Sequence, residues 1–187
     1  MSRDNLLPFP RGETFWNGNG VSATDPAGQN VLGKVFRVED TKYGSAGITL
    51  RVVQNLSGAA LTGVNAGRGV RYTGAVTGLS RKVAGYVAAQ GAYGVPIDDA
   101  YSGTTISAND IFYVVEEGYC KVKASLPTTA STTMSINSAF TWQAQGTIEP
   151  AAAGDHVGGR LVVALASGST AGNRVLAQVG GVAANLM

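Results

Sequence analysis

The sequence from residue 111 to residue 124, IFYVVEEGYCKVKA, decides which kind of fold we expect. It begins with five apolar residues, mainly β-branched and aromatic, and it ends in a stretch where polar and apolar residues alternate. Between the two parts stands Glu116-Glu117-Gly118, which has the composition of a turn. This pattern predicts a β-hairpin with a three-residue loop, because glycine readily takes the left-handed position that such a loop requires.

The return strand of this hairpin is predicted to have one dry face and one basic face. Cys120 and Val122 point inward, whereas Tyr119, Lys121 and Lys123 face water. A slip of one residue in the first strand would exchange its inward and outward side chains. Cys120 is the only cysteine, which excludes an intramolecular disulfide and a multi-cysteine zinc site, and we expect it to be a small core side chain.

The composition is typical of an all-β protein with many tight turns. The chain has 187 residues, of which 14% are charged and 26 are glycine, and turn signals recur at spacings of about ten residues. We therefore expect one β-rich domain over residues 33–187, a small β-barrel or β-sandwich with long loops. Its other strands are predicted at residues 35–39, 48–52, 70–73 and 83–89, with a closing hairpin of 160–166 and 174–179.

Two further stretches give weaker signals. Residues 126–141 are rich in serine and threonine and show no repeated apolar face, so we interpret them as a long surface loop. The stretch from Trp142 to Ile148 is predicted to be a strand.

Residues 1–32 do not follow any regular period, because prolines and glycines interrupt their apolar residues. One interpretation is a terminus that lightly covers its own domain. The other is an extended, largely irregular N-terminal arm whose aromatic side chains dock on a neighbouring subunit. In the second interpretation the contact residues are Leu6, Leu7, Phe9, Phe15 and Trp16.

We find no arrangement of residues that predicts catalysis, so we expect the protein not to be an enzyme and to bind no cofactor or metal. His156 is the only histidine and lies in a turn sequence, and the pairs Asp98-Asp99 and Glu116-Glu117 lie where acidic residues are common in turns. Residues 63–69 are glycine-rich but lack the ending of a phosphate-binding loop. The net charge of +2, with scattered basic residues, predicts no nucleic-acid partner.

Several stretches resemble bacteriophage head decoration (cement) proteins. These are GYVA at 85–88, the loop with Gly94-Val95-Pro96, the strands of 110–124, and GTIEPAAAGD at 146–155. The likeness covers residues 69–179, and the first third of the chain has no counterpart. The resemblance implies a homotrimer that sits on the outside of an expanded phage head and clamps neighbouring subunits of the major capsid protein. The N-terminal arm would then contact these capsid subunits or a neighbouring copy of the protein.

Two alternatives stay open on the sequence alone. One is another virion component, such as a tail-tube, head-fibre or minor capsid protein. The other is a carbohydrate-binding or adhesin module in which Trp142 and the serine- and threonine-rich loop form a sugar platform. We see no signal peptide and no apolar run long enough for a membrane helix, so we expect synthesis in the host cytoplasm and a final location on the virion.

Overall fold

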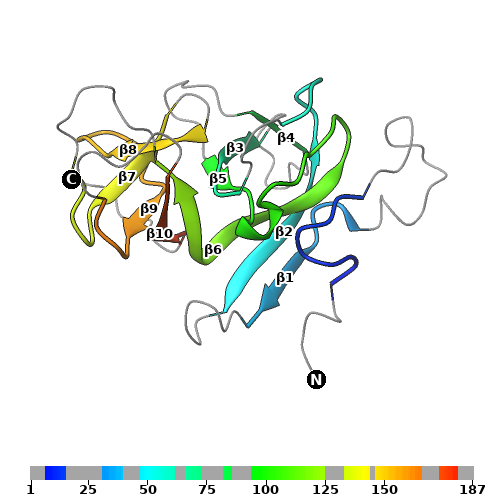
Figure 1. Ribbon diagram of the computed structural model, residues 1–187, viewed down its shortest axis with the longest axis horizontal. Coiled ribbons are helices and arrows are strands. Elements are labelled where there is room, and N and C mark those ends of the chain that lie inside the picture. The colour runs from blue at the N-terminus through cyan, green and yellow to red at the C-terminus, as the bar shows by residue number, and fades with distance from the viewer. Residues whose placement is uncertain are drawn as a thin grey trace.

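The computed structural model of this protein describes residues 7–15, 31–39, 47–61, 66–72, 82–85, 94–124, 133–143, 146–165 and 173–180. The all-β fold expected from the sequence is confirmed, and the strands form a sandwich-like arrangement of two lobes (Figure 1). The strands are β1 (Val35–Val38), β2 (Ile48–Asn55), β3 (Gly69–Tyr72), β4 (Lys82–Gly85), β5 (Gly94–Pro96), β6 (Ile111–Lys123), β7 (Ala139–Trp142), β8 (Ile148–Pro150), β9 (Gly159–Leu161) and β10 (Arg174–Val179). A 3-10 turn, η2 (Asp99–Tyr101), precedes β6.

Hydrogen bonds join the strands along one path, β5-β3-β4-β2-β6-β10-β9-β7-β8, and β1 also pairs with β2. The β2–β4 pair is parallel, and the other strand pairs are antiparallel. The first part of the sheet curls so strongly that Ile97, which follows β5, forms a single bridge with Val114 of β6. The first lobe contains β1 to β5 and the first half of β6, and the second lobe contains the second half of β6 and β7 to β10. Strand β6 therefore runs from one lobe to the other (Figure 1).

The predicted hairpin at residues 111–124 is wrong, because β6 is one continuous strand of 13 residues. Its first half pairs with β2, and from Gly118 onward it pairs with β10. The register against β2 shifts between Thr49 and Leu50, so Glu116 is the extra residue of a β-bulge. Gly118 has a φ of 115°. The acidic pair and the glycine therefore bend the strand from one lobe into the other instead of reversing it.

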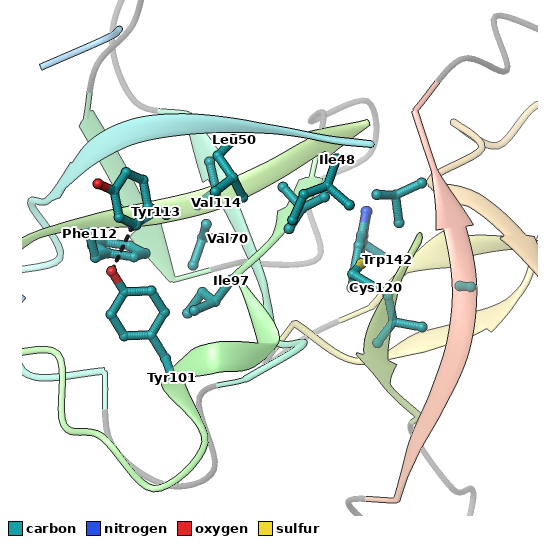
Figure 2. Packing of buried hydrophobic residues seen from close by; sticks show 14 of the residues in the cluster. Ile48, Leu50, Val70, Ile97, Tyr101, Phe112, Tyr113, Val114, Cys120 and Trp142 are labelled. Carbon is teal, nitrogen blue, oxygen red and sulfur yellow. Dashed lines mark hydrogen bonds between the residues drawn. The ribbon is translucent and has the colours of Figure 1, made fainter. Parts of the chain in front are cut away.

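Burial along β6 follows this change of partner. The five residues from Ile111 to Val115 are all buried, whereas the second half alternates, with Cys120 and Val122 inside. The alternation predicted for the second half is thus confirmed. Figure 2 shows Ile48 of β2 between the side chains of the first lobe and the pair Cys120 and Trp142, so one core runs through both lobes.

Trp142 packs between the two lobes and is only 4% exposed. A Cβ atom added to Gly69 would lie 2.5 Å from Trp142 Cε3, and one added to Gly158 would lie 2.7 Å from its Nε1. Gly94 stands equally close to the indole. Three glycines distant in sequence thus leave the space that this large side chain occupies.

Several local predictions hold and two do not. Strands are confirmed at β1, β2 and β3, and β9 and β10 form the closing hairpin, although β9 ends at Leu161 and not at residue 166. Of the predicted strand 83–89, β4 contains residues 83–85, and residues 86–89 lie outside the described part of the chain. The predicted strand from Trp142 to Ile148 is wrong, because β7 ends at Trp142 and β8 begins at Ile148, and the two strands pair with each other. The predicted surface loop of 126–141 is also wrong at its end, where Met134 and Phe140 are buried. Residues 125–132 lie outside the described part of the chain.

Candidate functional site

The most distinctive polar and aromatic arrangement lies where residues 7–15 pack against the start of β6 and against η2 (Figure 1). We call residues 7–15 the N-terminal segment. Phe15 forms an antiparallel bridge with Ile111, and its backbone donates to Ile111 O at 2.9 Å and accepts from Ile111 N at 2.6 Å. Because β2 occupies one edge of β6, Phe15 pairs with the other edge. The segment is therefore bound partly in the manner of an added strand.

Phe9 anchors the segment through its ring. The ring stacks on that of Tyr113 with centroids 4.4 Å apart and an interplanar angle of 20°. The Tyr113 hydroxyl donates to Phe9 O at 2.7 Å. Burial raises the pKa of Tyr113 to about 12, so this hydroxyl keeps its proton at neutral pH. Phe9 also helps to explain why Tyr113 is buried although it lies on the side of β6 opposite to its neighbours Phe112 and Val114.

Arg11 neutralises a carboxylate inside the protein. Its Nε and Nη2 atoms donate to the two oxygens of Asp98 at 2.7 and 2.6 Å, a bidentate pair. Asp98 is fully buried, whereas the Arg11 side chain is 22% exposed. Burial raises the pKa of Asp98, and the Arg11 charge acts in the opposite direction. The sequence-based interpretation of Asp98 as an ordinary turn residue is therefore incomplete, because it is the buried partner of an ion pair.

Tyr101 connects the segment with β6. Its hydroxyl donates to Glu13 O at 2.7 Å and accepts from Tyr113 N at 3.1 Å, and Figure 2 shows the second of these bonds. Burial raises the pKa of Tyr101 well above its ordinary value. Because one hydroxyl is shared by the segment and the strand, displacing the segment would leave a buried oxygen without an acceptor for its proton.

The structure locates three of the five contact residues predicted from the sequence. Leu7 and Phe9 are partly buried against the core, and Phe15 is 36% exposed. Leu6 and Trp16 lie outside the described residues. The contacts of the described segment are made within one chain, and the expected contact with a second subunit or with a capsid stays a prediction.

Four members of this site were not predicted from the sequence: Arg11, Asp98, Tyr101 and Tyr113. The partners lie far apart along the chain: Arg11 and Asp98 are separated by 87 residues, and Phe9 and Tyr113 by 104. A local signal existed only at Asp98-Asp99, where two acids directly follow the apolar residue Ile97.

A second polar cluster lies at the β-bulge of β6. The bulged residue Glu116 accepts hydrogen bonds at one oxygen, from Arg51 Nε at 2.5 Å and from the Tyr72 hydroxyl at 2.7 Å. Arg51 also donates to Gly33 O at 3.0 Å. Burial raises the pKa of Tyr72 far above its ordinary value. The cluster ties β2, β3 and β6 together, and we assign it a structural role.

Other candidates from the sequence have ordinary surroundings. His156 is exposed, and the described residues include no group of three or more histidine, cysteine, aspartate or glutamate side chains that could hold a metal ion. Cys120 is buried, and burial raises the pKa of its thiol. Because Trp142 is buried, it cannot supply the exposed sugar platform considered above. Within the described ranges, no helix has the length and apolar character needed to span a membrane.

The comparisons with known proteins found no relative. No protein-family model matches the chain, and neither the curated proteins nor the solved structures include a significant match.

Proposed function

We propose that this protein is a structural virion protein, a decoration or cement protein that binds the outer surface of a phage head and clamps neighbouring subunits of the major capsid protein. The sequence resemblance described above suggests this function, and the all-β fold is compatible with it. The observation that carries the proposal is how the N-terminal segment is bound: strand pairing at Phe15, ring stacking at Phe9 and an ion pair at Arg11. A segment with these three elements can also join the strand edge of a neighbouring protein.

A partly exposed aromatic side chain supports this role for the segment. Phe15 pairs with β6 through its backbone, yet its side chain remains 36% exposed. Aromatic side chains at protein interfaces often contribute a large share of the binding energy. On a shell, many copies act together, so a modest contact per copy is sufficient for stable attachment.

We expect Phe15→Ala to reduce attachment to expanded empty shells by about tenfold or more, because the side chain would lose its buried apolar contact on the shell. Cosedimentation of the full-length chain with such shells measures this loss. Val35→Ala is the matched control, since Val35 is an exposed apolar residue outside the segment, at 47%. Substitution is a cleaner test than deletion of residues 1–32, which would remove Arg11 from Asp98 and would remove Leu32, a buried core residue.

Each outcome of the shell experiment decides a separate point. If the wild type does not cosediment with shells, the decoration function is wrong. If the wild type binds and Phe15→Ala binds equally well at limiting concentration, the function stands but the role of Phe15 is wrong. A near-ultraviolet circular dichroism spectrum checks that both variants remain folded.

The second lobe offers apolar surface for the proposed trimer. Met134 and Leu165 form an antiparallel bridge, and near it Ile136 and Val163 are 60% and 51% exposed. These are the two most exposed large apolar side chains of the described residues. Exposed apolar residues that lie close together are typical of contact surfaces between subunits.

We expect the wild type to have a native molar mass near three times its chain mass of 19.1 kDa, and Ile136→Asp to shift it toward the monomer, because a buried unpaired carboxylate opposes association. Size-exclusion chromatography with light scattering measures both. Leu56→Asp is the control, because Leu56 is an exposed apolar residue of the first lobe, at 41%. A trimer that Ile136→Asp leaves intact would exclude this surface as the interface.

A further inference from the structure

The outer face of the second lobe carries positive charges that form no ion pair with a carboxylate of the described residues. In β6 the buried residues Cys120 and Val122 alternate with Lys121 and Lys123, which are partly exposed. Residues that are directly opposite in neighbouring strands share a face of the sheet. Arg174 of β10 is opposite Lys123 and therefore lies on the same face.

Arg160 of β9 extends this face, because its partner Gln178 is itself opposite Tyr119. We call Lys121, Lys123, Arg160 and Arg174 the basic face.

The two arginines of the basic face donate to neutral groups. Arg160 donates to Asn137 O at 2.9 Å, and Arg174 donates to Ser102 Oγ at 3.2 Å. Among the described residues, no carboxylate forms an ion pair with any of the four cations. Two acidic residues of the described strands share this face: Glu117, which lies beyond the bend at Gly118, and Glu149 of β8, which is opposite Thr141 of β7.

The pair of Lys123 and Arg174 is unfavourable within the isolated chain. Like charges directly opposite each other in an antiparallel pair destabilise a sheet. Lys121, two residues before Lys123 on the same face of β6, adds a further positive charge. An acidic partner would turn this repulsion into attraction on binding, and complementary charge also speeds and orients association.

We propose that the basic face is a docking surface for an acidic protein surface. Four cations and a net charge of +2 fit a local protein contact better than the long basic track that binds nucleic acid. Tyr119 is the one aromatic side chain on this face of β6, which does not make a stacking platform for bases. The inference goes beyond the capsid proposal, because it holds whether or not the partner is a capsid protein.

The test uses poly-L-glutamate as the acidic probe and the full-length chain at about 20 mM salt, where exposed charges are weakly screened. Lys121→Glu/Lys123→Glu is expected to reduce binding by about tenfold or more, because two attractive charges become repulsive. The matched control is Lys34→Glu/Arg37→Glu, which changes the net charge equally at exposed positions in and beside β1. It is expected to retain nearly all of the binding.

A stability measurement separates docking from damage to the fold. Lys123→Glu places a carboxylate opposite Arg174, so we expect the thermal midpoint to rise by about 1–3 °C while binding of poly-L-glutamate falls. A lower midpoint would contradict the like-charge argument.

Three binding results would overturn the proposal. Equal loss in the two double variants would show an effect of net charge only. Tighter binding of random-sequence duplex DNA, dependent on Lys121 and Lys123, would assign the face to nucleic acid. Absence of binding to either probe would show that the face does not dock polyanions.

Discussion

Replacing Arg11 by glutamine is expected to lower the free energy of unfolding at pH 7 by about 3 kcal/mol, because it leaves the fully buried Asp98 carboxylate without its partner charge. Arg11 is the only group in the segment that meets both oxygens of this carboxylate. Chemical denaturation of the full-length variant, compared with the wild type, measures the loss.

The loss should depend on pH in a defined direction. Burial and the neighbouring Asp99 charge raise the pKa of Asp98, and without Arg11 the main opposing influence is removed. The folded-state pKa then lies further above the unfolded value of about 3.9. Below that unfolded value Asp98 is protonated in both states and the variant is least affected. As the pH rises from the unfolded value through the folded-state pKa, the unfolded state releases this proton more readily than the folded state does, so the loss grows and reaches its full size above the folded-state pKa.

The double variant Arg11→Gln/Asp98→Asn is the control for this effect. It removes both charges and keeps side chains that can hydrogen-bond, so it should recover part of the lost stability and show no pH dependence from this site. If the single variant is equally destabilised at pH 4 and pH 7, the buried charge is not the cause. If it is not destabilised at all, the ion pair contributes nothing to the attachment of the segment.

Replacing Gly118 by alanine is expected to lower the free energy of unfolding by about 2–5 kcal/mol, because two separate costs fall on one residue. The first is the backbone φ of 115°, which L-residues other than glycine rarely adopt. The second is space: the new Cβ would lie 2.9 Å from Ile48 Cγ2 and 3.0 Å from Gly47 O, inside the joint between the lobes. The midpoint of urea denaturation measures the sum.

Gly103→Ala separates these two costs. Gly103 also has a positive φ, 82°, but no atom lies within 4 Å of the added Cβ. We expect it to lose about 1 kcal/mol, from the backbone alone. Equal losses at both positions would mean that crowding at the bend is unimportant and that β6 can shift there freely.

The sequence alone determined the features that depend on a residue and its immediate neighbours. Val38 in β1 and Ile48 in β2 are buried as their alternation predicts, and so are Cys120 and Val122 in the second half of β6. The composition also predicted the all-β class correctly. These predictions succeed because the period of two along a strand is a local property that a buried face imposes on any sheet.

The tertiary structure decided what the chain does at Glu116-Glu117-Gly118. A bulge followed by a glycine at positive φ is compatible with a tight turn and also with a bend. The choice depends on partners elsewhere: β10 offers Val175 and Ala177 opposite Val122 and Cys120, so the strand continues instead of folding back. Nothing in residues 111–124 themselves indicates that β10, which begins at Arg174, will pair with them.

The candidate site could not be predicted from the sequence for the same physical reason, because its contacts join residues that are distant along the chain. The aromatic residues of the N-terminal segment were visible as contact residues, but the ion pair of Arg11 and Asp98 exists only because the fold brings together positions 87 residues apart. Likewise, Trp142 is a buried side chain instead of a surface platform because glycines from β3 and β5 leave space for it. The local pattern of polar and apolar residues determined which strand faces are buried, whereas the pairing of distant strands decided which residues contact each other.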